Sequence, residues 1–275
     1  MSEKQREVLR IAWSMTLACI AGSAVLGVVF VATERYAEAA RAQGERRAIT
    51  ELLSLDSTAT VVEIRQYLSL EPRAVVYRAD GADGGVELRF SLDGDLLERQ
   101  PLAATAGDET DGLEPLGRIF VAEENGAPAG FVIEGASRGY KNVIRFFVAL
   151  DRNFEVAGVR VVEHEEDPGL GAEVATPWFQ GQYLGRAAES LDALEVTKDP
   201  MPEDWRAALD QLARMPEADW EDAYGPLAGR MREGPIHAVS GATISSEALT
   251  RGVRTTVDHF RRRWALIAPH LGGAS

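Results

Sequence analysis

The chain has 275 residues and a formal net charge of −14 at pH 7, from 29 basic and 43 acidic side chains. This acidic balance argues against nucleic-acid binding, because phosphate groups need a basic face on their partner. The single cysteine, Cys19, excludes an internal disulfide bond, a structural zinc site and an iron–sulfur cluster, so any redox chemistry requires a bound organic cofactor.

Residues 11–32 contain no charged side chain and predict one transmembrane helix near the amino terminus. At ~1.5 Å of rise per residue, a helix of this length can cross the hydrocarbon core of a bilayer. Basic residues precede the run (Lys4, Arg6 and Arg10), so the positive-inside rule places residues 1–10 in the cytoplasm and the bulk of the chain outside it. A cleaved signal peptide is the alternative, but the uncharged run is longer than a usual signal-peptide core.

Residues 33–72 predict a helical stalk between the membrane and a domain that spans residues 73–275. Residues 36–48 are rich in alanine, glutamate, arginine and glutamine, all of which are good helix formers. Residues 56–58 form a capping signal for a second short helix through Leu68.

From residue 73 the hydrophobic pattern changes to short runs separated by glycine, aspartate and proline turns, which is typical of strands. The predicted strands are residues 74–77, 86–90, 118–122, 130–133, 143–150 and 156–162. Residues 151–155 indicate a hairpin between the last two strands. The loop 103–117 holds four acidic residues, but their spacing matches no calcium-binding loop, so we expect a solvated loop.

Residues 164–234 predict mixed helical structure. His164 has no histidine partner, so we expect a surface or core residue rather than a metal ligand. A short helix with an apolar face is predicted around residues 178–183, and it is expected to belong to the core. Residues 186–234 carry an excess of acid, and a strand near residues 194–196 and a helix over 205–215 are predicted to pack on the domain surface.

The last helix is predicted after the sequence Ser240-Gly241-Ala242-Thr243, with Ser245 or Ser246 as its N-cap. Apolar residues at spacings of three and four give it one buried face: Leu249, Val253, Val257, Phe260, Trp264 and Ile267. Free N–H groups and the positive end of the helix dipole suit a phosphate group here. The small residues allow a large planar group to approach the backbone. A capped turn before a surface helix is the simpler alternative.

The sequence Ser-Gly-Ala-Thr-Ile-Ser-Ser at residues 240–246 resembles a flavin attachment motif. The motif belongs to the FMN-binding domain family that includes RnfG of the Rnf complex and NqrC of the sodium-pumping NADH:quinone reductase. The resemblance implies that Thr243 carries FMN through a phosphoester bond, which a separate flavin transferase makes. It also implies that the neighbouring residues contact the cofactor, namely Ser240, Gly241, Ala242, Ile244 and Ser245. His237 stands where the family usually has an aspartate.

A second stretch, residues 163–171, resembles the family's glutamate-threonine-proline-glycine-leucine-glycine motif. Glu166 matches the glutamate, and Asp167 replaces the threonine. The resemblance implies that the following turn lies against the flavin with its N–H groups toward the polar edge of the ring; this turn consists of Pro168, Gly169, Leu170 and Gly171. Tyr140 of a matching glycine-tyrosine pair is implied as a further contact. The family is usually shorter over residues 186–234, so we interpret this segment as an acidic insertion.

The fold expected from these elements is α+β, with a twisted, largely antiparallel sheet flanked by helices after one membrane helix. The resemblance is closer to RnfG than to NqrC. It implies an electron-carrier subunit, rather than a stand-alone enzyme, of an ion-translocating ferredoxin:NAD⁺ oxidoreductase complex. The protein would lie in the bacterial cytoplasmic membrane with its carboxy-terminal domain on the periplasmic side. Its expected partners are the other membrane proteins of the complex and the flavin transferase.

Three alternatives remain open at this point: an NqrC-like protein of the sodium-pumping NADH:quinone reductase, an accessory subunit without flavin, and a serine hydrolase built on Ser240. The hydrolase is the weakest, because the Gly-x-Ser-x-Gly elbow is missing and no acid near His237 is evident. No glycine-rich dinucleotide loop and no P-loop are present, so direct binding of NADH or ATP is not expected. The sequence predicts no catalytic residue and no metal site.

Overall fold

The structure is a computed structural model of the chain. It describes residues 3–52, 60–80, 85–102, 112–124, 127–212 and 214–271. These residues fall into two compact units, residues 1–47 and residues 48–275. Most of the first unit is helix α1 (Glu3–Leu52), and apolar side chains such as those of Trp13, Leu26 and Phe30 are more than half exposed on it. Among the described residues, no helix meets the combined length and hydropathy requirements for a membrane span.

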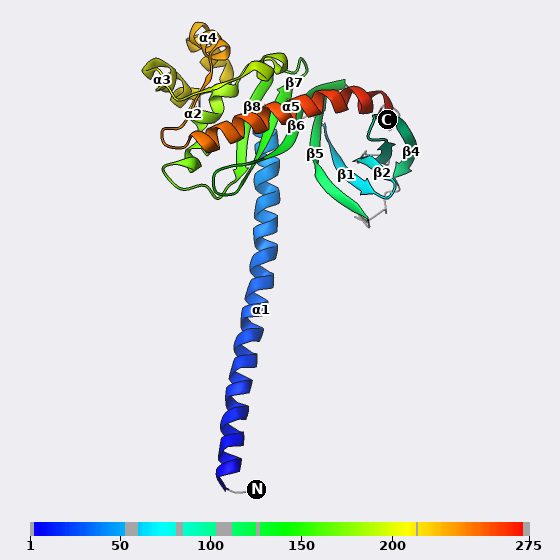
Figure 1. Ribbon diagram of the computed structural model, residues 1–275, viewed down its shortest axis with the longest axis vertical. Coiled ribbons are helices and arrows are strands. Elements are labelled where there is room, and N and C mark those ends of the chain that lie inside the picture. The colour runs from blue at the N-terminus through cyan, green and yellow to red at the C-terminus, as the bar shows by residue number, and fades with distance from the viewer. Residues whose placement is uncertain are drawn as a thin grey trace. The chain divides into compact units, whose positions relative to one another are not determined.

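The second unit is built on an eight-stranded antiparallel sheet with the strand order β4-β3-β2-β1-β5-β6-β7-β8. The strands are β1 (Thr60–Leu70), β2 (Arg73–Ala79), β3 (Gly85–Phe90), β4 (Leu96–Leu102), β5 (Leu113–Glu124), β6 (Ala127–Arg138), β7 (Val143–Asp151) and β8 (Val156–Glu163). Figure 1 shows helix α5 (Thr243–Leu271) lying across one face of this sheet. The predicted α+β class with a large antiparallel sheet is confirmed.

The main core lies between α5 and the sheet. The predicted apolar face of α5 is buried there, and Phe131 of β6 contacts both Phe260 and Trp264, with ring centroids 5.0 and 4.8 Å apart. A glycine at position 252 permits this close approach, since a Cβ there would lie 2.8 Å from the ring of Phe146. Strand β7 alternates between two cores, because its Phe147 faces a second, smaller cluster that includes Ile49.

The six predicted strands all lie within observed strands, and residues 143–163 form the predicted hairpin. The second stalk helix is wrong, because residues 60–70 form β1 rather than a helix. Ile64, Tyr67 and Leu68 have helical spacing, but pairing with β2 on one side and β5 on the other fixes the extended backbone. The sheet therefore begins at Thr60 instead of residue 73. The capping signal at 56–58 and most of the acidic loop, residues 103–111, lie outside the described residues.

Strand β4 was not predicted. It is an edge strand with mostly exposed side chains, and it begins with two leucines followed by three polar residues. An edge strand of this kind lacks the alternation that marks a half-buried strand, so its sequence gives no clear signal.

Short helices connect β8 to the insertion: η1 (Gly171–Ala175), α2 (Pro177–Gln180) and η2 (Gly181–Tyr183). The prediction that this segment belongs to the core is confirmed, since Phe179 and Tyr183 are fully buried. The hydroxyl groups of Tyr183 and Thr250 lie 2.8 Å apart, which links η2 to α5.

The insertion contains η3 (Ala188–Ala193), β9 (Val196–Thr197), α3 (Glu203–Leu212) and α4 (Glu217–Glu233), and it ends at β10 (Ile236–His237). Helix α3 coincides with most of the predicted helix. The insertion is more than a surface layer, because Leu209 and Trp220 are buried in the main core. Trp220 also donates a hydrogen bond from Nε1 to the carbonyl oxygen of Ala208 at 2.7 Å, which joins α4 to α3.

Candidate functional site

Helix α5 begins earlier than the sequence suggests. The predicted N-cap at Ser245 or Ser246 is wrong, because helical hydrogen bonding already starts at Ala242, whose carbonyl oxygen accepts from the N–H of Ser246 at 3.1 Å. Gly241 makes the preceding turn possible with φ of +78°. Thr243 is therefore the first helical residue, and its own N–H group belongs to the first turn, where N–H groups have no partner within the helix.

The two serines of this turn have structural hydrogen bonds. The hydroxyl of Ser246 accepts from the N–H of Val239 and donates to the carbonyl oxygen of Ala242, both at 3.0 Å. These bonds close the loop that leads into α5. The hydroxyl of Ser245 donates to the carboxylate of Glu166, which lies 79 residues earlier in the sequence. The attachment-like motif is thus fixed to the second motif by a direct bond.

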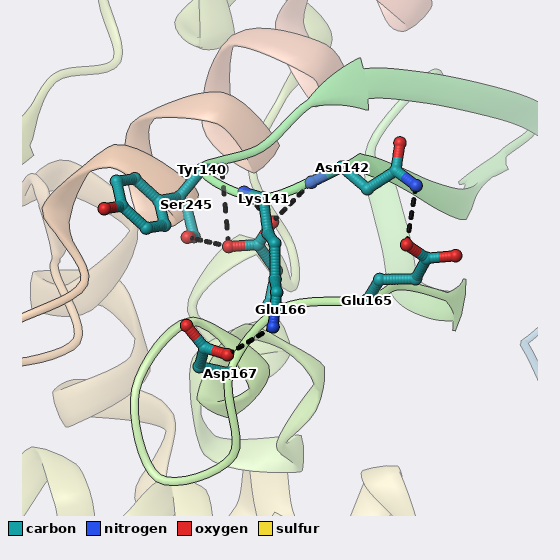
Figure 2. Close-up of polar contacts among 7 residues, drawn as sticks. All are labelled: Tyr140, Lys141, Asn142, Glu165, Glu166, Asp167 and Ser245. Carbon is teal, nitrogen blue, oxygen red and sulfur yellow. Dashed lines mark hydrogen bonds and ion pairs between the residues drawn. The ribbon is translucent and has the colours of Figure 1, made fainter.

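Glu166 connects three segments of the chain (Figure 2). Its side chain is only 4% exposed, and it accepts from the N–H groups of Tyr140, Lys141 and Asn142 at 3.3, 2.9 and 3.4 Å, in addition to the Ser245 hydroxyl. We call this arrangement the Glu166 clasp. It holds the loop between β6 and β7 against the first turn of α5.

The Glu166 carboxylate stays ionised in this buried position. Burial alone would raise its pKa, because desolvation disfavours a charge, but the hydrogen bonds from Ser245 and from the backbone of residues 140–142 outweigh burial. The pKa of Glu166 is consequently below its ordinary value. The clasp is a fixed negative charge that four hydrogen-bond donors stabilise.

Two exposed polar contacts lie beside the clasp (Figure 2). The ammonium of Lys141 lies 2.6 Å from a carboxylate oxygen of Asp167, and this bond raises the pKa of Lys141. The side-chain amide of Asn142 donates to Glu165 at 2.7 Å. Asp167, which replaces the threonine of the family motif, therefore helps to hold the same loop as Glu166.

Glycines at positions 139 and 171 make room for the clasp. A Cβ at Gly171 would lie 2.5 Å from Glu166 Oε2 and 2.8 Å from the Ser245 hydroxyl, and a Cβ at Gly139 would lie 2.5 Å from Glu166 Oε1. Gly171 is thus needed for packing, because its φ is not in the positive region that Gly169 adopts at +73°. The role of Gly139, Lys141 and Asn142 was missed at the sequence level, where only Tyr140 was singled out.

A cavity of about 480 Å³ opens between the two motifs. It is lined by Tyr140, Glu166, Asp167, Leu170, Gly171, Gly241, Ala242, Thr243, Ile244 and Ser245. Most of the predicted site residues are thereby brought together. Pro168, Gly169 and Ser240 do not line this cavity.

The cavity matches a ligand with one anionic end and one planar apolar part. Its volume is within the usual range of small-molecule sites, roughly 300–1,000 Å³. The start of α5 supplies free N–H groups and a positive dipole end for an anion. Three apolar side chains at the rim remain exposed, with 68% of Tyr140, 46% of Leu170 and 55% of Ile244 accessible. Such exposed apolar side chains around one opening indicate a binding surface.

His237 does not line this cavity. It is only 8% exposed, its ring Nδ1 lies 3.0 Å from the carbonyl oxygen of Asp199, and its ring meets Trp205 edge-on with centroids 5.4 Å apart. The residue that departs from the family pattern is thus engaged with the insertion.

The expectation for His164 was a surface or core position, and the side chain is partly buried, with a buried Nδ1 that has no hydrogen-bond partner in the described part of the chain. Among the described residues, no group of three or more potential ligands is placed to hold a metal ion.

Residues 139–258 match the model of the FMN-binding domain family, and this match contains the clasp, the cavity and the first turn of α5. This part of the chain is an FMN-binding domain. The matched region begins at Gly139, the first residue of the loop held by Glu166, and ends at Asp258 on α5, beyond the cavity.

Curated relatives of the FMN-binding domain are components of redox complexes, and each of the following is named as the G component of its complex. The protein of a proton-translocating ferredoxin:NAD(+) oxidoreductase complex from Clostridium ljungdahlii is 28% identical over 139 residues, which cover 50% of this chain and 57% of the relative. The protein of an ion-translocating oxidoreductase complex from Methanosarcina acetivorans is 27% identical, with 50% and 54% covered. The protein of a Na(+)-translocating ferredoxin:NAD(+) oxidoreductase complex from Acetobacterium woodii is 23% identical, with 54% and 57% covered. The chain thus spans little more than half of these relatives.

Solved structures of NqrC, a component of the Na(+)-translocating NADH-quinone reductase, are also similar to this chain. The protein from Shewanella oneidensis has 15% sequence identity and a TM-score of 0.45, and the match covers 82% of this chain and 99% of that one. The protein from Parabacteroides distasonis has 18% identity and a TM-score of 0.36, with 60% and 71% covered.

Proposed function

We propose that the cavity holds FMN, which is bound covalently through a phosphoester to Thr243, and that the chain is an electron-carrier subunit of an Rnf-type complex. One observation supports this proposal above all. Thr243 at the start of α5 lines the same cavity as Glu166, Leu170 and Gly171 of the second motif. The relatives named as components of ferredoxin:NAD(+) oxidoreductase complexes supply the class of complex.

The residues of the chain have distinct roles in this proposal. The first turn of α5 binds the phosphate through its N–H groups, and the small residues Gly241 and Ala242 let the cofactor approach the backbone. Tyr140, Leu170 and Ile244, which line the cavity with exposed apolar surface, would contact the ring, while Glu166 holds the surrounding loops in place. FMN supplies the redox chemistry by accepting and donating electrons, and the protein contributes position and electrostatics.

We also propose a membrane location. The uncharged residues 11–32 form the anchor, and the basic residues before them keep residues 1–10 in the cytoplasm. The FMN-binding domain then lies on the periplasmic side of the bacterial cytoplasmic membrane. Its partners are other membrane proteins of the complex and, during maturation, a flavin transferase. The covalent bond prevents loss of the cofactor from an exported domain.

The alternatives differ in what they require of the site. An NqrC-like protein of a sodium-pumping NADH:quinone reductase uses the same residues in another complex. An accessory subunit without flavin is the second candidate, because Asp167 and His237 depart from the family motifs and both side chains are engaged in other contacts. A hydrolase built on Ser240 is disfavoured, because the ring of His237 contacts Asp199 and Trp205.

Replacing Thr243 with alanine tests the attachment. The full chain is co-expressed with a flavin transferase, and its intact mass and its fluorescence on a denaturing gel are measured. We expect the Thr243→Ala variant to lose the FMN mass and the fluorescence while remaining folded. Thr255→Ala, an exposed threonine on the same helix, is the matched control and should keep both signals. An FMN adduct on Thr243→Ala would refute the assignment, and an unmodified wild-type chain would favour the accessory subunit.

A further inference from the structure

The acidic insertion reaches back to the loop that carries Thr243. Its short strand β9 pairs in parallel with β10, so that Val196 lies opposite Ile236. The N–H of Ile236 donates to the carbonyl oxygen of Glu195, and the N–H of Ala238 donates to that of Thr197, both at 2.9 Å. Residues 236–237, which lead into the attachment-like motif, therefore pair as a strand with residues 196–197 of the insertion.

Gln182 holds the same segment through its side chain. Its side-chain oxygen accepts from the N–H of His237 at 2.8 Å, and its side-chain nitrogen donates to the carbonyl oxygen of His237 at 3.2 Å. Gln182 is itself only 5% exposed. Both backbone groups of His237 are thus satisfied in a buried position, which fixes the path of the chain at this residue.

The ring of His237 completes the contact with the insertion. Its Nδ1 lies 3.0 Å from the carbonyl oxygen of Asp199, which can only accept, so the ring donates from Nδ1. Trp205 of α3 packs edge-on against this ring and also against Gly234, where a Cβ would lie 2.9 Å from the Trp205 ring. An ionised aspartate at position 237 would place a carboxylate oxygen against the carbonyl oxygen of Asp199, and neither atom can donate a hydrogen bond.

The constraint continues from His237 to Thr243. The N–H of Val239 donates to the Ser246 hydroxyl at 3.0 Å, and the N–H of Ala242 donates to the carbonyl oxygen of Val239 at 2.9 Å. Hydrogen bonds therefore link Val239, two residues after β10, to the first turn of α5. A displacement of β10 would be transmitted to Thr243.

We propose that residues 195–206 of the insertion, together with Gln182, form a brace that positions Thr243 for flavin attachment, with His237 as its anchoring position. The brace explains why the chain has an imidazole at position 237, since its Nδ1–H meets the carbonyl oxygen of Asp199. His237, Gln182 and Trp205 are positioning residues that act through the loop. The consequence for attachment rests on the proposed function, whereas the brace itself can be measured without any flavin.

The first measurement is amide hydrogen exchange on the full chain without a transferase. Trp205→Ala and His237→Asp should each accelerate exchange at Ile236, Ala238 and Val239 by roughly tenfold or more, because hydrogen bonds of this loop would open locally. Exchange in β7 should stay unchanged. Tyr224→Ala is the matched control, because this ring also belongs to the insertion but packs on Trp220; it should leave the loop protected.

The second measurement is the initial rate of flavin attachment with a transferase. We expect a loss of about tenfold or more in Trp205→Ala and His237→Asp and near-normal rates in Trp205→Phe, which keeps an aromatic edge, and in Tyr224→Ala. Unchanged loop exchange in both folded variants would refute the brace. Faster exchange with an unchanged attachment rate would refute its role in positioning Thr243. If the wild-type chain takes no flavin, the proposed function fails, while the exchange data still decide on the brace. Should Trp205→Ala not fold, His237→Asp carries both measurements, with Trp205→Phe and Tyr224→Ala as its controls.

Discussion

Replacing Glu166 with glutamine tests the clasp that holds the site together. The change keeps the size of the side chain, but one carboxylate oxygen becomes an amide nitrogen and the negative charge is lost. When the amide nitrogen replaces the oxygen that accepts from Tyr140 and Ser245, the remaining oxygen can still accept from Lys141 and Asn142. Hydrogen bonds to a charged group contribute ~1.5–3 kcal/mol each, and the new amide can recover part of this by donating to Ser245. We therefore expect the free energy of unfolding to fall by roughly 2–4 kcal/mol at pH 7.

The pH dependence gives this prediction a specific signature. The folded-state pKa of Glu166 is depressed, so its contribution is fully present above the ordinary carboxyl pKa of about 4.3 and is lost as the pH falls through the folded value. The difference in unfolding free energy between wild type and Glu166→Gln should accordingly shrink as the pH falls below about 4.

The assay is urea denaturation of the full chain at several pH values. Glu165→Gln is the matched control, because this neighbouring carboxylate has only the side chain of Asn142 as a hydrogen-bond partner among the described residues. A substitution of this kind should change the unfolding free energy by no more than about 0.5 kcal/mol. If Glu166→Gln costs no more than Glu165→Gln, or if its cost is the same at low and neutral pH, the reasoning about the clasp is wrong.

Three further predictions concern the neighbouring structure. Gly171→Ala should lower the unfolding free energy by about 1–3 kcal/mol, as measured by urea denaturation, because the new Cβ displaces Glu166. The same variant should shift the visible flavin spectrum. An unchanged spectrum in flavinylated protein would count against contact between this turn and the ring. Arg186→Met should cost roughly 2–5 kcal/mol in the same urea denaturation assay. The buried guanidinium, whose pKa burial lowers to about 10, donates to the carbonyl oxygens of Met231 and Arg232 at the end of α4, and both bonds would be lost. The Asp222→Cys variant should react with a membrane-impermeant maleimide in spheroplasts, whereas labelling only after lysis would reverse the proposed topology.

The sheet and its covering helix could be predicted because their signals are local. Alternation marked the strands, and the spacing of apolar residues from Leu249 to Ile267 marked the buried face of α5. The error at β1 has a physical cause. Its sequence also fits a helix, and only pairing with β2 and β5 makes the backbone extended. Sheet pairing involves residues far apart in the chain, which a window of sequence does not contain.

Most residues that line the cavity could be named from the sequence, but the contacts that build it could not. Two motifs identified Thr243 and Glu166, yet neither indicated that Glu166 accepts backbone N–H groups from residues 24 to 26 positions earlier. Backbone donors have no side-chain signature, so residues 140–142 could not be recognised from their identities. The brace was hidden for the same reason, because the main partners of His237 are the side chain of Gln182 and a carbonyl oxygen.

The two supports together bear on which hydroxyl in the first turn of α5 would carry the proposed flavin. Three residues there carry one, namely Thr243, Ser245 and Ser246. Ser245 bonds to the Glu166 clasp, and Ser246 closes the loop that continues from the brace. Either serine would have to break a bond that fixes the turn before its oxygen could react. Thr243 lines the cavity and takes no part in these bonds, so its hydroxyl can be modified while the turn that presents it stays intact.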